Sequence, residues 1–184
     1  MIRPISMIRP ISIIKQLRTL KTITINNINE TIIEREDYPI NKCLSIINNT
    51  PIGVVGYGPQ GRSQSLNLKD NGFNVNIGVR KGASYDLALE DGWIPDKNLF
   101  SIEESVEKST IIQYLISDVG QIKLWDTIKP HLTENKTLYF SHGFAITYND
   151  KTNIKVPTNI DVILVAPKGA GLTVRNKFLE GKGI

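Results

Sequence analysis

The residue types and spacing best suited to chemistry occur in the glycine-rich stretch Gly56-Tyr57-Gly58-Pro59-Gln60-Gly61, which has the pattern GxGxxG. This stretch directly follows an apolar run that predicts a buried strand, and it opens a predicted helix, as a dinucleotide-binding loop requires. In that context Gly56 permits a tight turn, Gly58 lets the backbone approach a pyrophosphate, and Gly61 lets the helix pack closely on the strand. The N–H groups and positive dipole end of the helix would face the phosphates. A purely structural glycine turn is the alternative, and the context favours a dinucleotide site.

The residues after the second predicted strand decide which dinucleotide such a loop would hold. NAD-preferring domains place an acid there to bind the ribose 2′-hydroxyl. Here the sequence is Arg80-Lys81-Gly82-Ala83-Ser84. A guanidinium, an ammonium and a hydroxyl would bind a 2′-phosphate, whereas a carboxylate would repel it. The sequence therefore predicts NADP(H) rather than NAD(H), with a solvated basic turn as the alternative.

The tetrapeptide Ser117-Asp118-Val119-Gly120 follows the apolar run 110–116, which predicts a strand. Ligands in open α/β sheets bind at the carboxyl ends of the strands. We therefore expect these residues to border the nicotinamide half of the cofactor. Asp118 could also cap the helix that follows, and the two roles are compatible.

Two further polar side chains follow predicted strands in the same way. His142, one of only two histidines in the chain, lies between a serine and a glycine after the run 136–140. A lone histidine is more often structural than catalytic, but this placement makes the two alternatives about equal. Lys168 follows the run 161–166 and is flanked by glycine. It could anchor a phosphate or the substrate, with a surface lysine as the alternative.

Strands and helices alternate along the chain from residue 51 onward. The central strands are apolar on both faces, as in a parallel sheet sandwiched by helices. With right-handed crossovers, this pattern predicts an α/β fold, a Rossmann-type doubly wound parallel sheet with helices on both faces. Strands are predicted over 51–55, 73–79, 110–116, 136–140 and 161–166, and helices over 60–70, 84–90, 102–108 and 119–131. Before them we expect an extended segment near 23–25 and a lead-in segment over 25–50 with a short helix near 41–47.

The beginning of the chain differs in composition from the rest. The 184 residues include 22 Lys and Arg and 18 Asp and Glu, for a formal net charge of +4. Five of the basic residues and no acid lie in 1–29, so the remaining 17 basic residues oppose 18 acids. Arginine, serine, threonine and apolar residues without acids predict an organellar transit peptide over 1–24, disordered or an amphipathic helix near 11–21. We expect a mitochondrial destination, with a plastid-type organelle or a disordered basic arm as alternatives.

Composition excludes several other classes of protein. The single cysteine, Cys43, excludes an internal disulfide framework and a cysteine-rich zinc site. No apolar run approaches the ~18 residues of a membrane span. The basic segment lacks the interleaved aromatic residues on which bases stack. We therefore expect neither a nucleic acid nor a membrane among the partners.

Taken together, the motifs resemble those of ketol-acid reductoisomerase, also called acetohydroxyacid reductoisomerase, in its fungal mitochondrial form. GYGPQG, GVRKGAS, LISDVGQ, LYFSHGF and DVILVAPKGAG occur in the order and spacing of that family, together with EREDYP and EDGWIPDKNLF. The resemblance runs from about Leu20 to Ile184. It implies an NADPH- and Mg²⁺-dependent oxidoreductase of valine and isoleucine biosynthesis that forms a homo-oligomer. An alkyl group of the acetohydroxy acid substrate migrates and NADPH reduces the new ketone, so that 2-acetolactate becomes 2,3-dihydroxyisovalerate.

The resemblance also implies roles for individual residues. In the family, the metal ligands are carboxylates of a second, all-helical domain, so no metal ligand is assigned in this chain. Cofactor-binding roles fall on Tyr57–Gln60, Arg80, Ser84, Ser117–Val119 and Gly171, and catalytic roles on His142 and Lys168.

Two departures from the family pattern matter. Pro59 stands where the family usually carries Ser or Ala, which removes one potential phosphate contact. We expect binding to survive, because Gln60 and Gly61 keep the pattern. The sequence also ends where the family's hinge into the helical domain begins, so we expect 51–184 to be the NADP-binding domain of a longer enzyme and this chain alone to be inactive. A non-catalytic NADP-binding module and another NADP-dependent two-domain hydroxy-acid dehydrogenase are the alternatives.

Overall fold

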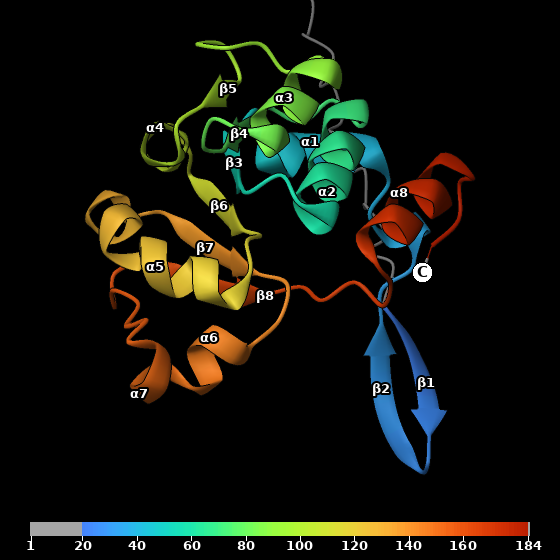
Figure 1. Ribbon diagram of the computed structural model, residues 1–184. Helices are drawn as coiled ribbons and strands as arrows, with labels where there is room; N and C mark the ends of the chain where they lie inside the picture. Colours follow the sequence, from blue (N-terminus) through green and yellow to red (C-terminus); the bar gives the residue numbers. More distant parts are fainter. Residues whose placement is uncertain (1–19, 184) are drawn as a thin grey trace, which may run out of the picture. The chain divides into compact units, whose positions relative to one another are not determined.

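The computed structural model describes residues 20–183, coloured along the chain in Figure 1. The chain separates into two compact units between Cys43 and Leu44, a few residues before the boundary predicted at 50–51. The predicted leader over 1–24 lies mostly outside the described residues. Within the part that is described, no helix combines the length and the apolar character needed to cross a membrane.

The first unit contains a two-stranded hairpin, in which β1 (Lys21–Ile25) pairs antiparallel with β2 (Ile28–Ile32). The turn residues Asn26 and Asn27 both have positive φ, 49° and 63°, as the common two-residue hairpin turn requires and asparagine tolerates. The extended segment expected here is therefore β1, whereas β2 was not predicted. Because β1 begins at Lys21, the last residues of the predicted leader lie in a strand rather than in a helix.

A short 3-10 helix, η1 (Arg35–Asp37), leads to α1 (Ile40–Ile47), which crosses the boundary between the units. The backbone N–H of Glu34 donates to the Asp37 carboxylate at 2.8 Å and fixes the start of η1. The short helix predicted near 41–47 is confirmed as α1.

The second unit is built on a six-stranded sheet in which every neighbouring pair of strands is parallel. The spatial order is β5-β4-β3-β6-β7-β8, which is 3-2-1-4-5-6 when this sheet's strands are counted along the chain, the order of dinucleotide-binding sheets. The strands are β3 (Ile52–Val55), β4 (Val75–Gly78), β5 (Leu99–Phe100), β6 (Ile111–Tyr114), β7 (Thr137–Phe140) and β8 (Asp161–Leu164). The helices are α2 (Pro59–Asp70), α3 (Ala83–Glu90), α4 (Ile102–Lys108), α5 (Asp118–Ile128), η2 (Lys129–His131), α6 (Phe144–Thr147), α7 (Asn149–Thr152) and α8 (Gly171–Leu179).

Successive side chains of β3 face opposite sides of the sheet and belong to two separate cores. Val54 is buried in one core with apolar side chains of α2 and α3. Val55 is buried in the other with apolar side chains of α4 and α5, including Trp125. Because helices cover both faces, the predicted doubly wound α/β fold is confirmed.

Differences from the predicted elements lie mainly in the second half of the chain. The run 161–166 does form β8, an edge strand, but all four strand residues are exposed and none of them belongs to either core. The helix predicted over 119–131 ends at Ile128 and continues as η2, which contains Pro130. Proline cannot donate the next helical hydrogen bond, so the helix tightens and stops there. The short elements β5, α6 and α7 and the longer α8 were not predicted.

Candidate dinucleotide site

A cavity of about 920 Å³ lies at the carboxyl ends of the parallel strands. Here β3 has β4 on one side and β6 on the other, so successive connections leave in opposite directions and open a crevice. The volume is within the range of sites for small molecules and cofactors, roughly 300–1,000 Å³. The lining residues are Gly56–Gln60, Val79–Ser84, Ile102, Tyr114–Ser117, Gly120, Gln121, Leu124, Ser141, His142, Ala170 and Gly171.

The glycines of the loop between β3 and α2 have distinct geometries. Gly56 has φ +97°, a conformation that favours glycine. A Cβ added at Gly61 would overlap the carbonyl oxygen of Gly56, so the helix lies directly against the loop. A Cβ added at Gly58 would meet no protein atom within 4 Å, because this residue faces the cavity. The loop thus turns sharply and exposes its backbone where a ligand could approach.

Pro59 is the first residue of α2, and Gly58 is the N-cap. Proline suits this position, because its φ is already helical and the N–H it lacks would have no acceptor within the helix. The N–H groups of the next residues, Gln60 and Gly61, belong to the first turn, which has no carbonyl of its own to bind. The proline is therefore compatible with an anion at the start of α2.

The loop after β4 contributes positively charged side chains to the lining of the cavity. Arg80 and Lys81 line it with exposed side chains, and Ser84 lies in the first turn of α3. Gly82, with φ +135°, caps that helix, and its carbonyl accepts a hydrogen bond from the N–H of Tyr85 at 2.8 Å. Among the described residues that line the cavity, none is an aspartate or a glutamate. The site therefore suits an anionic ligand.

The loops after β6 and β7 bring Asp118 and His142 together. The imidazole Nε2 lies 3.3 Å from the Asp118 Oδ1, an ion pair when the imidazole is protonated. Ser117 caps α5, because its hydroxyl accepts from the N–H of Gly120 at 3.2 Å. The capping role considered for Asp118 is therefore wrong, and its carboxylate faces the histidine instead.

The segment after β8 closes another side of the cavity through the start of α8. Gly171 lies so near the Pro59–Gln60 peptide that a Cβ would overlap it. Arg175 holds α8 on α2, since its guanidinium binds the Asn67 Oδ1 at 2.8 Å and the Asp70 carboxylate at 2.7 Å.

The structure brings most of the residues singled out from the sequence to one place, and it leaves a few outside. Gly61 lies behind the loop, Asp118 lies next to a lining residue, and Val119 and Lys168 are exposed and are not among the lining residues. The residues at the cavity are Gly56, Tyr57, Gly58, Pro59, Gln60, Arg80, Lys81, Ser84, Ser117, His142 and Gly171.

A chain of polar side chains that was not predicted joins α2 to the ends of β7 and β8. Gln60 Nε2 donates to the Gly169 carbonyl at 3.0 Å, and Gln64 Nε2 donates to Gln60 Oε1 at 3.0 Å. Gln64 also contacts Ser141 Oγ at 3.2 Å and the Tyr139 hydroxyl at 2.9 Å. Burial raises the pKa of Tyr139, which keeps it a neutral phenol. The four-residue spacing of the two glutamines, which places them on one helix face, was the signal available in the sequence.

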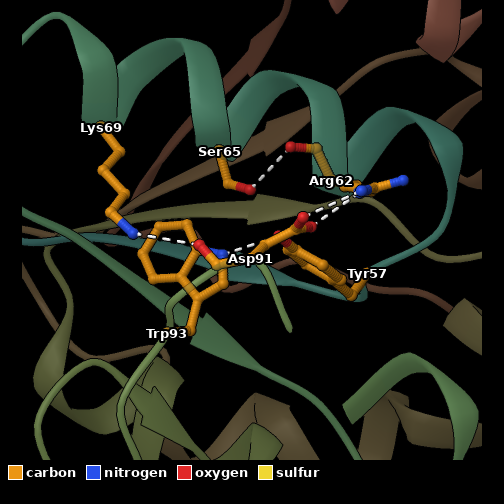
Figure 2. A network of polar contacts seen from close by, with 6 residues as sticks. All are labelled: Tyr57, Arg62, Ser65, Lys69, Asp91 and Trp93. Atoms are coloured by element: carbon orange, nitrogen blue, oxygen red, sulfur yellow. Dashed lines mark hydrogen bonds and ion pairs between the residues drawn. The ribbon is translucent and has the colours of Figure 1, made fainter. Parts of the chain in front are cut away.

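Figure 2 shows a second network, which holds the side chain of Tyr57. The Tyr57 hydroxyl donates to Asp91 Oδ2 at 2.8 Å and accepts from Trp93 Nε1 at 2.7 Å. Arg62 binds both oxygens of the same carboxylate, at 2.7 and 2.8 Å. The guanidinium holds the pKa of Asp91 below its usual value, while burial and then the Asp91 hydrogen bond raise the pKa of Tyr57. The carboxylate is therefore charged and the phenol protonated at neutral pH.

Residues 20–183 include no group of three or more His, Cys, Asp or Glu side chains placed to hold a metal ion. The donors around the cavity are backbone N–H groups, hydroxyls and cations, which suit phosphate rather than Mg²⁺. The described site therefore fits a dinucleotide and does not fit a metal ion.

Comparison with known proteins agrees with this assignment. The family model "Acetohydroxy acid isomeroreductase, NADPH-binding domain" matches residues 46–184. The mitochondrial ketol-acid reductoisomerases of Neurospora crassa and Saccharomyces cerevisiae are 50% and 51% identical over 168 residues. Each match covers 91% of this chain and 42% of the relative, so the chain spans less than half the length of these relatives. A solved NADH-preferring ketol-acid reductoisomerase from an uncultured archaean matches with a TM-score of 0.73 and 38% identity, over 84% of this chain and 45% of that one.

Proposed function

The chain belongs to the ketol-acid reductoisomerase family, and we propose that it supplies the NADPH-binding part of an enzyme of valine and isoleucine biosynthesis. The reaction would convert 2-acetolactate to 2,3-dihydroxyisovalerate by alkyl migration and reduction. In this proposal the described residues bind the cofactor, since the matching family model is an NADPH-binding domain. Family membership sets aside the alternative of another hydroxy-acid dehydrogenase.

One observation carries the proposal: the glycine loop, the basic loop and His142 line a single cavity that has no carboxylate in its described lining. A dinucleotide with an additional 2′-phosphate is a strongly anionic ligand, and a crevice with cations and free N–H groups would stabilise it. Arg80 and Lys81 supply the two cations of the basic loop. An acid in their place would instead favour a free 2′-hydroxyl.

In this proposal each part of the cavity holds a different part of the cofactor. The backbone of Gly58 and the first turn of α2 would bind the pyrophosphate. Arg80 and Ser84 would bind the 2′-phosphate, and Ser117 would border the nicotinamide half. When bound, NADPH supplies the hydride that reduces the ketone.

In this proposal His142, which lines the cavity, would contact the substrate. Asp118, whose Oδ1 lies 3.3 Å from the imidazole Nε2, would orient that ring. Lys168 lies outside the cavity lining, so we assign it no step. Mg²⁺ enters the proposal only through the family resemblance, and no step is assigned to it because the described residues offer no ligand set.

Charge reversal at the basic loop tests the cofactor assignment. In Arg80→Glu, a carboxylate would face the 2′-phosphate, so we expect the Kd for NADPH to rise about 100-fold and that for NADH only a few-fold. Both constants can be measured by titrating the fluorescence of the reduced nicotinamide with the purified chain.

Lys155→Glu is the matched control, because it makes the same change of charge at an exposed lysine outside the cavity. We expect this variant to bind both dinucleotides as the unaltered chain does. Equal losses of NADPH and NADH affinity in Arg80→Glu would refute the assignment. NADPH binding without acetolactate turnover in the longer protein with Mg²⁺ would favour a binding module instead.

We also propose a mitochondrial location and a homo-oligomeric enzyme with a small acetohydroxy acid as substrate. The basic leader without acids supports the location, as do the names of the two fungal relatives, both called mitochondrial. The oligomer and the substrate follow from the family resemblance.

A further inference from the structure

The network in Figure 2 includes side chains that the proposed cofactor contacts do not use. Arg62, Asp91 and Trp93 do not line the cavity. Arg62 lies near the start of α2, while Asp91 and Trp93 belong to the loop that follows α3. Asp91 and Trp93 belong to the stretch EDGWIPDKNLF, which resembles the family but makes none of the proposed cofactor contacts.

We propose that Tyr57, Arg62 and Asp91 form a positioning network that fixes the basic loop relative to the glycine loop and thereby sets the preference for NADPH over NADH. The inference rests on the proposed function, because it requires the cavity to bind a dinucleotide.

On one side, the network holds the glycine loop itself. Tyr57 is the second residue of GxGxxG, lines the cavity and is only 2% exposed. Its phenol makes hydrogen bonds to Asp91 and Trp93 and meets the Trp93 ring edge-on, with centroids 6.4 Å apart and planes at 85°. A loop residue with its ring fixed by three contacts cannot move without moving its partners.

On the other side, the network holds the far end of α3. Asp91 is the C-cap of this helix, and the basic loop leads directly into its first turn. Eight residues of α-helix span about 12 Å and behave as a short rigid rod. Lys69 adds a second tie, since its ammonium donates to the carbonyls of Asp91 and Gly92 and lies 4.5 Å from the centre of the Trp93 ring. Fixing the end of α3 on α2 therefore restrains the loop that carries Arg80.

The ion pair also determines which cations are left to face a ligand. Arg62 places two of its N–H groups on one carboxylate, so its charge is matched within the protein. Arg80 and Lys81 are the cations of the cavity lining, among the residues the structure describes. In this proposal the cations that bind the 2′-phosphate therefore lie on a loop whose position depends on Asp91.

The two dinucleotides should respond differently when this restraint is lost. NADPH would bind both loops at once, with its pyrophosphate on the glycine loop and its 2′-phosphate on the basic loop. NADH has no 2′-phosphate and would depend on the glycine loop alone. Loosening one loop relative to the other therefore weakens NADPH binding more than NADH binding, whereas a general loss of stability would affect both alike.

The experiment compares Asp91→Asn and Tyr57→Phe with the unaltered 184-residue chain. Asp91→Asn removes the charge that binds Arg62, so we expect the Kd for NADPH to rise about tenfold, which corresponds to about 1.4 kcal/mol of binding free energy. We expect the NADH constant to change about twofold, which lowers the preference about fivefold. Tyr57→Phe removes one hydroxyl and should lower the preference in the same direction by a smaller factor.

Lys136→Met is the control for a purely structural effect. The Lys136 ammonium donates to the carbonyls of Val106, Glu107 and Ser109 at the end of α4, away from both cofactor loops. This variant should unfold at lower urea concentration and keep the NADPH preference unchanged.

Two results with Asp91→Asn would overturn the inference while leaving the proposed function standing. One is an unchanged preference for NADPH over NADH in the folded variant. The other is tighter NADPH binding caused by the released Arg62. If Asp91→Asn does not fold, Tyr57→Phe decides, and an unchanged preference there has the same meaning. An unaltered chain that binds neither dinucleotide would refute the proposed function and the inference together.

Discussion

Replacing Gly171 with alanine should push α8 away from the glycine loop. The new Cβ would overlap the Pro59 carbonyl group and lie 2.7 Å from the amide nitrogen of Gln60. Ordinary contacts between heavy atoms are roughly 3.5–4.0 Å, so the two segments must separate by at least about 1.5 Å. Backbone atoms cannot relieve this by a rotamer change. Overpacking of this kind costs about 1–3 kcal/mol.

The displacement should also reach the cavity. Arg175 holds α8 on α2, and the Gly169 carbonyl accepts a hydrogen bond from Gln60, so the strain is shared with the glycine loop. Since 1.4 kcal/mol corresponds to a factor of ten, we expect the Kd for NADPH to rise about 5- to 10-fold in Gly171→Ala. The Tm should fall by about 2–4 °C for each kcal/mol of destabilisation.

Thermal unfolding and NADPH fluorescence titration measure the two effects on the same samples. Gly183→Ala is the matched control, because a Cβ there meets no atom within 4 Å. It should leave both the Tm and the NADPH affinity unchanged. If Gly171→Ala behaved like this control, the close contact between α8 and the glycine loop would be refuted.

Two further predictions concern acid stability and the leader. Because Arg62 lowers the pKa of Asp91, this carboxylate stabilises the fold above the pKa of an unfolded aspartate, about 3.9, and the stabilisation is lost as the pH falls through the lower folded pKa. The urea midpoint should therefore fall more between about pH 5 and pH 2 in the unaltered chain than in Asp91→Asn, and parallel declines would contradict this. A fluorescent reporter behind residues 1–24 should enter mitochondria, and a diffuse cytosolic signal would rule out the transit peptide.

Sequence alone was sufficient for the features that depend on neighbours along the chain. A glycine turn between a strand and a helix requires only its own six residues, and Gly56, Gly58 and Gly61 have the geometry their spacing predicts. The basic loop follows its strand directly, so its place at the carboxyl edge of a parallel sheet was fixed once the sheet was predicted. The doubly wound fold followed from the alternation of apolar strands and helices.

Prediction failed where an element depends on a distant partner. Helix α8 is held on α2 by Arg175 and Asn67, which are 108 residues apart in the chain. The spacing of apolar residues in α8 is a weaker signal for this helix than its contact with α2. The exposure of β8 had the same kind of cause, since its apolar sequence could not reveal that its side chains would join neither core.

The partners of individual side chains were decided only by the tertiary structure. Strand order places Asp118, His142 and Lys168 near one edge of the sheet, but it does not fix the direction in which each loop turns. The folded chain pairs Asp118 with His142 and leaves Lys168 outside the cavity. It also joins Tyr57 to Asp91 across 34 residues, because Arg62 and Lys69 of α2 bind the end of α3 and hold the Asp91 carboxylate 2.8 Å from the Tyr57 hydroxyl. The sequence by itself thus determined the fold and its two cofactor loops, and the packing between helices decided how those loops are held.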